Sequence, residues 1–301
     1  MEGEVYDIII VGSGPAGLTA AVYAGRYLMK TLVIGELSGG MISEAHKVCN
    51  FPTYKSISGM ELTQKMVDQV KSLGVEIRNE RTEEVRKNDV FEVKTTEGVY
   101  HGKTVILATG TEKRKLDIKG EKEFLGKGVS YCATCDAGFF KDKTVAIVGG
   151  SDAALTAALL LAEYAKKVYI IYRKDHFFRA EPAWIKQVEA EKKIEPVFNS
   201  NITEIKGGSL VESIKLDTGK ELAVDGVFVE IGLIPITELA EKLDIKLEKG
   251  HIVVDRMQRT SVPGIFAAGD ITNNPLKQAI TAAAEGAIAA TTAYEKIKGD
   301  G

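Results

Sequence analysis

The same local pattern occurs twice in this chain of 301 residues, and it restricts the folds that the chain can adopt. An apolar strand runs into a glycine-rich turn, a helix and a second strand, first over residues 6–34 and again over residues 144–172. The two turns begin at Gly12 and Gly149, 137 residues apart. Such βαβ units form parallel sheets that helices cover. The sequence therefore predicts an α/β protein with two nucleotide-sized modules.

The order of the segments indicates that the second module is inserted into the first. In each module an apolar strand ends in glycine, at residues 104–110 and 226–232. The C-terminal segment ends in an alanine-rich helix and is too short for a core of its own, so we expect it to return to the first module. We expect two Rossmann-like, three-layer ββα domains, with boundaries at residues 1–115, 116–236 and 237–301. Glycine, proline and charged residues at the two junctions favour a hinge.

The charge and the apolar segments exclude several classes of protein. Lysine and arginine number 39 against 42 aspartates and glutamates, so we expect neither a nucleic-acid partner nor an anionic membrane partner. The longest apolar runs, at residues 153–162 and 279–284, are far shorter than the roughly 20 residues that cross a bilayer. The acidic start, from Met1 to Glu4, lacks the features of a secretion signal. We expect a cytoplasmic protein.

The first glycine-rich turn has the spacing of a dinucleotide-binding loop. Its three glycines would give a tight turn, let a pyrophosphate approach the backbone and allow close helix packing. The helix N-terminus behind the loop favours the negative charge of a pyrophosphate. An acid follows the next strand, where a carboxylate accepts hydrogen bonds from a ribose. An ordinary turn is the alternative. The candidate residues are Gly12, Ser13, Gly14, Pro15, Ala16, Gly17 and Glu36.

The second glycine-rich turn departs from this pattern in a way that suggests a different nucleotide. Ser151 stands where the glycine that approaches the phosphates is expected. A basic cluster takes the place of the ribose-binding acid, and this suits the 2′-phosphate of NADPH. A solvated patch of charge would look similar. The candidate NADPH-binding residues are Gly149, Gly150, Ser151, Asp152, Ala153, Arg173, Lys174 and Arg179.

Cys132 and Cys135 are the most specific candidates for chemistry. Two cysteines three positions apart on a turn or helix start can close a disulfide and reopen it. The reactive thiolate is favoured at a helix N-terminus, so the pair could attack the disulfide of a partner. Asp136 is adjacent to the pair and could move the proton that each exchange requires.

A zinc site is the competing interpretation of these cysteines. His46 and Cys49 share with the pair the ligand types that zinc accepts. The two half-sites lie more than 80 residues apart and in different expected modules, whereas the half-sites of zinc proteins are usually adjacent. We therefore interpret Cys49 as a small buried residue and expect no metal.

Taken together, these segments resemble the low-molecular-weight thioredoxin reductases, which form class II of the pyridine nucleotide-disulfide oxidoreductase family. The resemblance extends over nearly the whole chain, and its most specific part is the Cys-Ala-Thr-Cys-Asp sequence at residues 132–136. That family also inserts a cysteine-bearing NADPH domain between two halves of an FAD domain. By resemblance, the FAD site would also include Gly39, Gly40, Met41, Asn50, Ala108, Thr109, Gly110, Gly269, Asp270, Lys277, Gln278 and Ala279.

The resemblance also implies roles for some of these residues. Asp270 would bind the ribityl chain or the pyrophosphate, and backbone groups at Gln278 and Ala279 would meet the flavin ring at a helix N-terminus. That helix dipole would favour the negative charge of a reduced flavin. The resemblance further implies that Cys135 faces the flavin and that Cys132 attacks thioredoxin or a thioredoxin-like protein. A homodimer is implied as well.

Four positions depart from the pattern of the family. They are Met41 in place of glutamine, Thr53 in place of glycine, Ser151 in place of glycine, and Tyr172-Arg173-Lys174 in place of His-Arg-Arg. The last two belong to the NADPH site and leave the electron donor open, because some relatives take electrons from ferredoxin or a deazaflavin. A flavoprotein resembling ferredoxin–NADP reductase, with idle cysteines, is a further alternative. Arg173 and Arg179 keep NADPH as the expected donor.

Overall fold

The computed structural model describes residues 4–36 and 39–299, which fold into two compact units. Unit 1 comprises the described residues of Met1–Ser43, Lys47–Glu112 and Pro235–Gly301, and unit 2 comprises Glu44–His46 and Lys113–Ile234. The grouping of Glu44–His46 with unit 2 has no counterpart in the expected boundaries. Met1 to Gly3, which belong to the acidic start, lie outside the described residues.

Unit 1 is built on a parallel sheet with the strand order β3-β2-β1-β6, and β19 pairs with β6 on its other side. The antiparallel strands β5 and β4 continue the sheet from the first half of β6. The strands are β1 (Val5–Val11), β2 (Thr31–Ile34), β3 (Glu76–Arg78), β4 (Thr82–Lys87), β5 (Phe91–Thr95), β6 (Val99–Leu107), β17 (Leu247–Glu248), β18 (His251–Ile252) and β19 (Ile265–Ala267). The helices are α1 (Pro15–Arg26), α2 (Gly59–Ser72), α6 (Glu238–Lys242) and α7 (Ala279–Gly299).

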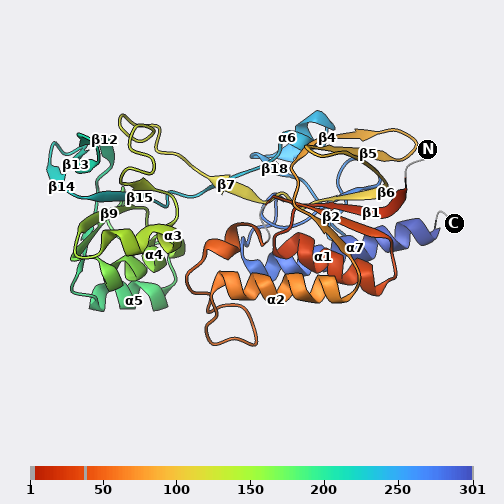
Figure 1. Ribbon diagram of the computed structural model, residues 1–301, viewed down its shortest axis with the longest axis horizontal. Coiled ribbons are helices and arrows are strands. Elements are labelled where there is room, and N and C mark those ends of the chain that lie inside the picture. Colours follow the sequence, from red (N-terminus) through yellow and green to blue (C-terminus); the bar gives the residue numbers. More distant parts are fainter. Residues whose placement is uncertain (1–3, 37–38, 300–301) are drawn as a thin grey trace. The chain divides into compact units, whose positions relative to one another are not determined.

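Side chains of the parallel strands alternate between two cores, which makes unit 1 a three-layer structure. Ile8 and Ile10 pack with α1, α2 and α7, whereas Ile9 and Val11 pack with β4, β5 and α6. The helices α1, α2 and α7 lie on one side of the sheet, and β4, β5 and α6 lie on the other (Figure 1). Because both faces are buried, the strands appear in the sequence as continuous apolar runs.

Unit 2 repeats this plan on a parallel sheet with the order β11-β10-β9-β15-β8. Helices α4 and α5 cover one face, and a separate antiparallel sheet, β12-β13-β14, covers the other. The strands are β8 (Val129–Ser130), β9 (Thr144–Val148), β10 (Lys167–Ile171), β11 (Ile194–Val197), β12 (Ile202–Gly207), β13 (Val211–Leu216), β14 (Glu221–Ala223) and β15 (Gly226–Val229). The helices are α3 (Ala133–Asp136), the 3₁₀ helix η2 (Ala137–Phe140), α4 (Asp152–Tyr164) and α5 (Pro182–Ala190).

The two parallel sheets share one topology. The order β11-β10-β9-β15 in unit 2 corresponds to the order β3-β2-β1-β6 in unit 1. The last strand of each series has one further parallel partner, β8 beside β15 and β19 beside β6. This order is that of Rossmann-like dinucleotide-binding folds. The expected fold class, two Rossmann-like domains with the second inserted into the first, is confirmed.

Two connections join the units, and they pair with each other as short strands. The first contains β7 (Thr111–Lys113) and the second contains β16 (Leu233–Pro235). The longer segment of unit 2 runs from Lys113 to Ile234, and its ends lie within three residues of the boundaries expected at 115/116 and 236/237. The amide of Arg114 donates to the carbonyl oxygen of Gly232 at 3.0 Å, so the pairing extends beyond β7.

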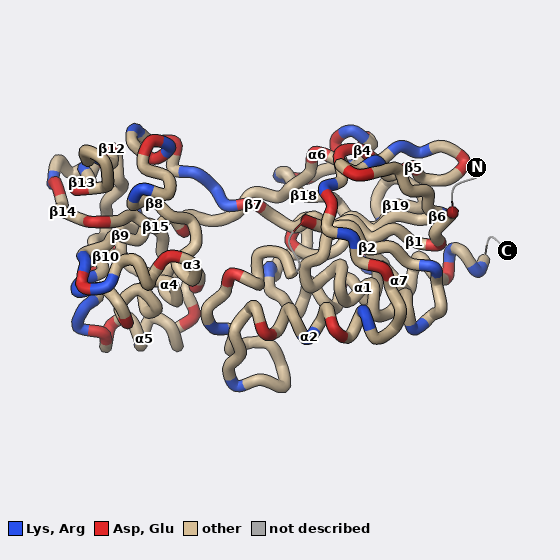
Figure 2. Tube along the Cα trace, viewed as in Figure 1, with Lys and Arg blue, Asp and Glu red and all other residues tan. Residues whose placement is uncertain are grey.

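The described residues also bear on membranes and on charge. No helix within residues 4–36 and 39–299 is long and apolar enough to cross a bilayer. Lysine and arginine are interspersed with aspartate and glutamate along both units (Figure 2).

Candidate functional site

The first glycine-rich turn joins β1 to α1, and packing requires glycine at its first and third positions. Gly12 has a φ of +118°, and a Cβ on it would overlap the carbonyl oxygen of Ala108. A Cβ on Gly17, in the first turn of α1, would overlap the carbonyl oxygen of Gly12. The loop is therefore held tightly between β1, α1 and the end of β6.

Gly14 differs from these two glycines, because the protein itself leaves room for a side chain there. Its φ is −80°, and the nearest atoms that a Cβ would meet, in Gly39 and Gly40, are 3.7 and 3.9 Å away. No side chain of the described residues caps α1, and its first turn holds Pro15 and no acid. The N–H groups at this helix end are available to an anion. A glycine that packing does not require, at such a helix end, fits the pyrophosphate of FAD.

Other expected FAD segments meet this loop at the carboxyl ends of the parallel strands. The amide of Gly39 donates to the carbonyl oxygen of Ser13 at 2.7 Å. A Cβ on Gly269, just after β19, would lie 3.1 Å from the Cβ of Ala16. The carboxyl ends of parallel strands are where open α/β sheets bind their ligands. The structure thus brings together the segments that begin at Gly12, Gly39, Ala108 and Gly269.

The segment around Asn50 reaches the start of α7. The side-chain amide of Asn50 donates to the side-chain oxygen of Gln278 at 3.0 Å, although the two residues are 228 positions apart in the sequence. Ala279 is the first residue of α7, so Gln278 and Ala279 lie at a helix N-terminus. A flavin ring at this position would meet backbone N–H groups and the positive end of the helix dipole.

The remaining expected FAD residues lie near these segments in the chain. Glu36 is exposed, two residues after β2. Met41 lies in the 3₁₀ helix η1 (Gly40–Glu44). Thr109 donates its hydroxyl to the carbonyl oxygen of Ile236 at 2.8 Å, and Gly110 has a φ of +65°.

A buried carboxylate that sequence reasoning missed supports the turn at Gly269 and Asp270. Glu285 of α7 is 7% exposed, and its Oε2 accepts the amide of Gly269 at 2.6 Å. Burial raises the pKa of Glu285 and that of Asp270, and it lowers the pKa of Lys277. The ammonium of Lys277 donates to the carbonyl oxygen of Thr272, which holds the same turn from its other end. The available signal was a charged residue within an alanine-rich helix.

The second glycine-rich turn joins β9 to α4. As in the first turn, packing requires glycine at its first position. Gly149 has a φ of +143°, and a Cβ on it would overlap the carbonyl oxygen of Glu230. Gly150 lies against the ring of Tyr172, which a Cβ would approach to 2.5 Å. Ser151 is the N-cap of α4 and makes no side-chain capping bond within the described residues. The first turn of α4 also holds the acid Asp152, which α1 lacks, so an anion at this helix end would meet backbone N–H groups beside a carboxylate.

Asp152 brings two of the expected NADPH segments together. Its Oδ1 accepts the amide of Glu181 at 2.6 Å, which ties the start of α4 to the segment that carries Arg179. Arg173 and Lys174 directly follow Tyr172 after β10, and they are exposed, as are Arg179 and Ala153. Three exposed cations thus follow the carboxyl end of β10, where Rossmann-like folds carry the residues that distinguish a ribose from a 2′-phosphate.

Cys132 and Cys135 form a disulfide at the start of α3, with their Cα atoms 5.3 Å apart. Cys132 is the N-cap of α3, and its Sγ accepts the amide of Cys135 at 3.2 Å. Cys135 is exposed and Cys132 is half-buried. The amide of Asp136 donates to the carbonyl oxygen of Cys132 at 3.2 Å, which closes the turn around the pair.

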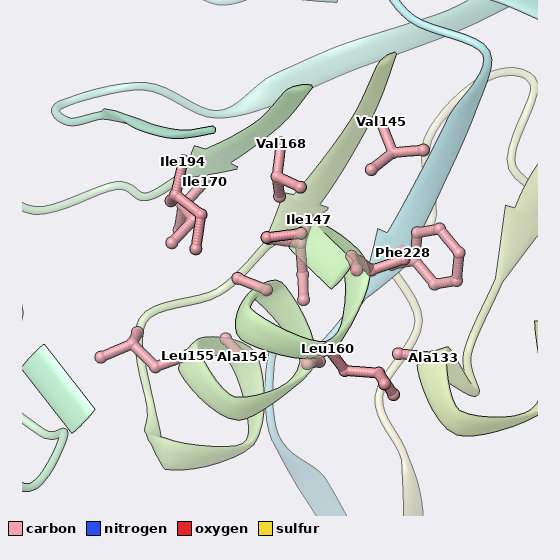
Figure 3. Packing of buried hydrophobic residues seen from close by; sticks show 14 of the residues in the cluster. Ala133, Val145, Ile147, Ala154, Leu155, Leu160, Val168, Ile170, Ile194 and Phe228 are labelled. Carbon is pink, nitrogen blue, oxygen red and sulfur yellow. The ribbon is translucent and has the colours of Figure 1, made fainter. Parts of the chain in front are cut away.

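The core of unit 2 anchors this redox turn. Ala133 is 6% exposed and belongs to the same buried cluster as Leu160 and Phe228. Figure 3 shows Ala133 beside Leu160 of α4. On the other side of Cys132, the buried hydroxyl of Ser130 accepts the Cys132 amide at 3.0 Å. A turn fixed to a packed core presents its sulfurs in a constant geometry.

The expectation that Cys49 is buried is wrong. Its thiol is exposed and is a free cysteine among the described residues. Val48 pairs with Ile57 in an antiparallel bridge and is buried, and successive side chains of an extended segment point to opposite sides. Cys49 therefore points outward. Within the described ranges, no group of histidine, cysteine, aspartate and glutamate side chains could hold a metal ion.

Comparison with known proteins places these features in one family. The sequence matches the family described as pyridine nucleotide-disulphide oxidoreductase over residues 6–286. The chain belongs to this family. The thioredoxin reductase of Treponema pallidum is 43% identical over 300 residues, which cover 97% of this chain and 97% of the relative. The matched range includes both glycine-rich loops, the redox turn and the turn at Gly269.

Solved structures of this family have the same fold. The thioredoxin reductase of Lactococcus lactis, in the FR conformation, is 37% identical over 98% of this chain and 99% of its own, with a TM-score of 0.94. A ferredoxin-flavin thioredoxin reductase of Clostridium acetobutylicum is 36% identical over 99% of this chain and 100% of its own, with a TM-score of 0.55. At nearly equal identity and coverage the scores differ widely, so these two relatives differ from each other in whole-chain geometry.

Proposed function

We propose that the protein is a thioredoxin-disulfide reductase that passes electrons from NADPH through FAD and the Cys132–Cys135 disulfide to thioredoxin or a thioredoxin-like protein. The observation that carries this proposal is the disulfide at the N-terminus of α3, in a chain that also has two dinucleotide-binding loops. The protein is a flavin-dependent oxidoreductase that uses FAD and NADPH, in keeping with its family.

Unit 1 would hold FAD. When bound, FAD takes an electron pair from NADPH and makes it available to a disulfide. The N–H groups at the start of α1 would bind the pyrophosphate, Glu36 the ribose, and Asp270 the ribityl chain or the pyrophosphate. The backbone at Gln278 and Ala279 would face the flavin ring. The other proposed contacts are Gly12, Ser13, Gly14, Pro15, Ala16, Gly17, Gly39, Gly40, Met41, Asn50, Ala108, Thr109, Gly110, Gly269 and Lys277.

Unit 2 would hold NADPH. The start of α4 would receive its pyrophosphate, because the N–H groups of a helix end favour an anion. Arg173, Lys174 and Arg179 would bind the 2′-phosphate through charge-assisted hydrogen bonds. The other proposed contacts are Gly149, Gly150, Ser151, Asp152 and Ala153.

The redox turn would perform two thiol–disulfide exchanges. An electron pair and two protons convert the Cys132–Cys135 disulfide to a dithiol. The Cys132 thiolate attacks one sulfur of the disulfide in thioredoxin, which breaks that bond and forms a mixed disulfide. Cys135 then attacks the Sγ of Cys132, re-forms the internal disulfide and releases thioredoxin as a dithiol. Asp136 would move the protons, and the Cys135 amide at 3.2 Å would stabilise the Cys132 thiolate.

An exposed ring next to the redox turn suits a protein substrate. Phe139, in η2, is 76% exposed, and it follows the end of α3 by three residues. Large apolar side chains that are exposed beside a reactive group are typical of protein interaction sites. We propose that Phe139 contacts the thioredoxin partner. A Phe139→Ala variant should then raise the KM for thioredoxin and leave NADPH-driven flavin reduction unchanged.

The paired connections β7 and β16 are the proposed hinge of the molecule. One cysteine pair must react with a flavin and with a protein substrate in turn, and one fixed arrangement cannot serve both reactions. Connections of a few residues can absorb the backbone changes of a hinge. The difference in TM-score between the two solved relatives supports a family in which whole-chain geometry varies.

We also propose that the protein is a cytoplasmic homodimer. Ile280 and Ile288 of α7 are each 37% exposed and, eight positions apart, lie on one face of the helix, which a second copy could cover. A reductase of protein disulfides belongs in a compartment that keeps thiols reduced. Light scattering should therefore give twice the 32.6 kDa of one chain, and a mass of 32.6 kDa would contradict the dimer.

Replacement of the cysteines tests the central proposal by separating its half-reactions. In a Cys132→Ser variant, anaerobic bleaching of the flavin by NADPH should persist, whereas reduction of thioredoxin should be lost. Insulin precipitation with added thioredoxin measures the second reaction. The matched control is Cys49→Ser, which removes an exposed thiol and should retain both reactions. Thioredoxin reduction by Cys132→Ser at the parent rate would contradict the proposal.

A second candidate electron donor follows from one relative. The Clostridium acetobutylicum structure is named a ferredoxin-flavin thioredoxin reductase. Ser151 and Tyr172-Arg173-Lys174 depart from the pattern of the family at the proposed NADPH site. Anaerobic titration with NADPH, NADH and reduced ferredoxin distinguishes the donors by flavin bleaching. We expect NADPH to bleach the flavin at the lowest concentration. A flavoprotein with idle cysteines would instead show equal reactions in the parent and in Cys132→Ser.

A further inference from the structure

A buried carboxylate in unit 2 has no part in the chemistry described above, yet it reaches the redox turn through one neighbour. Glu121 is 2% exposed. Its Oε1 accepts the amide of Leu116 at 2.7 Å and the hydroxyl of Tyr131 at 2.6 Å. Its Oε2 accepts the amide of Asp117 at 2.6 Å. A buried carboxylate is costly unless donors satisfy its oxygens, so these three bonds fix Glu121 firmly.

Tyr131 connects this carboxylate to Cys132, the next residue in the chain. Burial and the hydrogen bond from Tyr131 to Glu121 raise the pKa of Tyr131, so its hydroxyl remains a donor across the physiological range. The carbonyl oxygen of Tyr131 accepts the ammonium of Lys113. That carbonyl belongs to the peptide bond that leads into Cys132. The peptide is therefore held from the ring side and from the carbonyl side.

The residues that fix this peptide, directly or through Glu121, belong to the chain segment that connects the units and to the residues just after it. Lys113 is the last residue of β7, and Leu116 and Asp117 follow it within four residues. The ammonium of Lys113 also lies 3.2 Å from Oε1 of Glu230, which precedes β16 by three residues. Burial raises the pKa of Glu230, and the charge of Lys113 opposes this shift. Tyr131 thus ties the start of the redox turn to the first connection directly and to the second through Lys113.

We propose that Glu121 and Tyr131 are positioning residues for the Cys132–Cys135 pair, which fix the peptide before Cys132 to the connections so that the pair moves with them as one body. The core contacts of Ser130 and Ala133 hold the turn locally, whereas Glu121 and Tyr131 hold it to the segments at the proposed hinge. This inference rests on the proposed function, because the pair must be aligned twice, with bound FAD and with thioredoxin.

Tyr131→Phe is the primary test, because it removes one oxygen atom and keeps the ring packed. Turnover with thioredoxin should fall about tenfold, since misplacement of reacting groups by about 1 Å can cost about a hundredfold in rate. NADPH-driven bleaching of the flavin does not involve the pair and should keep its rate. The control is Tyr169→Phe, because Tyr169 is also half-buried against the same apolar cluster of unit 2. That variant should retain both rates.

Glu121→Gln tests the other half of the contact. Glutamine keeps one acceptor oxygen, and its N–H₂ group leaves one of the two backbone amides, that of Leu116 or that of Asp117, without an acceptor. The double variant with Tyr131→Phe should be no slower than the slower single variant, because the hydroxyl and the carboxylate act as one unit. Additive losses would contradict the proposal. The control is Glu204→Gln, which removes a carboxylate paired with Lys119 at 2.5 Å at the exposed surface.

Two further measurements separate positioning from other roles and need no turnover. Hydrogen exchange should quicken in residues 113–117 and 129–136 of Tyr131→Phe and remain unchanged elsewhere. The disulfide of the holoenzyme, equilibrated with dithiothreitol and scored by alkylation and mass spectrometry, should keep its equilibrium constant within about twofold, because a positioning contact acts on rate. Cys49 adds a constant background of one thiol.

The outcomes are distinct from those that test the proposed function. A parent that does not reduce thioredoxin would overturn the proposed function, and hydrogen exchange would still decide whether Tyr131 holds the turn. Unchanged exchange in residues 129–136 would overturn the positioning role. Equal losses in flavin bleaching and thioredoxin turnover would overturn it too, because they would indicate general damage. A large change in the thiol equilibrium would show that these residues tune the sulfurs instead of placing them.

Discussion

The glycine-rich loops of unit 1 and unit 2 follow one backbone plan and differ where a nucleotide would touch them. At the first position they agree, because Gly12 and Gly149 have φ values of +118° and +143° and each lies against a strand-end carbonyl. At the third position they differ. Gly17 has no room for a Cβ beside the Gly12 carbonyl, whereas unit 2 accommodates the buried Ala154.

The positions that would face the ligand differ more strongly. Gly14 and Glu36 of unit 1 correspond to Ser151 and Arg173 of unit 2, at the same separation of 137 residues that relates Gly12 to Gly149. Glu36 and Arg173 are both exposed, two residues after β2 and β10. An acid suits an unmodified ribose and a base suits a 2′-phosphate. Packing thus accounts for the first glycine of each loop and for Gly17. The differences at Gly14 and Ser151 and at Glu36 and Arg173 are those that the proposed nucleotides would explain.

The largest effect is expected at the third loop position. A Gly17→Ala variant forces a methyl group against the Gly12 carbonyl, and such overpacking costs about 1–3 kcal/mol or more. The loop would shift away from the pyrophosphate, so the purified protein should lose its flavin. The ratio of flavin to protein absorbance after gel filtration measures this loss. The matched control in unit 2 is Ala154→Gly, which should cost at most about 1 kcal/mol and keep the flavin. A Gly17→Ala protein that keeps its full flavin content would show that the two loops tolerate a Cβ at the third position equally well.

A smaller but selective effect is expected at the position that carries opposite charges in the two units. Arg173→Ala should raise the KM for NADPH about tenfold or more, because a hydrogen bond to a charged group contributes about 1.5–3 kcal/mol. The KM for NADH should stay the same, since NADH has no 2′-phosphate. Steady-state kinetics with both nucleotides measures the ratio. The control is Lys192→Ala. Lys192 is exposed and lies before the amino end of β11, whereas Arg173 follows the carboxyl end of β10. Equal losses with both nucleotides would count against the assignment of Arg173.

Making the second loop more like the first should have a modest effect. Ser151→Gly removes a side chain that caps nothing among the described residues, so it should change stability by only a few tenths of a kcal/mol. Closer approach of the phosphates should lower the KM for NADPH by about twofold to threefold, within the range of one weak contact. Ser151→Ala keeps a Cβ and is the control. A rise in KM with Ser151→Gly would show that the serine hydroxyl itself binds the nucleotide.

The smallest effect concerns the pH dependence of the buried carboxyls, one in each unit. Burial raises the pKa of Glu285 and of Glu230, so each contributes stability below its unfolded pKa of about 4.3 that is lost as the pH rises through its folded pKa. Glu285→Gln should therefore gain stability relative to the parent as the pH increases from about 4.5. Melting temperatures of the holoenzyme between pH 4.5 and 7.5 measure this difference. Glu230→Gln should gain less, because it removes one of the two carboxylates that pair with the Lys113 ammonium, Glu230 at 3.2 Å, and leaves Glu44 at 3.0 Å. A difference that is constant with pH would contradict the expectation for Glu285.

The chemistry-bearing segments could be predicted because each is a local pattern. The spacing of Gly12, Gly14 and Gly17 after an apolar strand, and of Cys132 and Cys135 on a turn, indicates their structure without knowledge of distant neighbours. The assignment of each residue to a cofactor remains a prediction. Cys49 shows where local reasoning fails, because the average burial of cysteine does not reveal which side of the bridge at Val48 it occupies.

The supporting residues could not be predicted, for a related reason. Glu121 meets Tyr131 ten positions away, Glu285 meets Gly269 sixteen positions away, and Asn50 meets Gln278 across 228 positions. In the sequence, Glu121 is one acid in a charged stretch, and nothing distinguishes it from Glu123. Its 2% exposure and its three donors distinguish it in the folded chain.

By itself, the sequence determined that this protein has two βαβ modules, one inserted into the other, and a cysteine pair on a turn in the second. Hydrophobic periodicity, glycine spacing and cysteine spacing encode these features within short segments. Only the tertiary structure decided which side chains hold the loops and the redox turn in place. Burial and hydrogen-bond partners arise when strands and helices pack, and that packing joins residues whose separation in the chain carries no signal.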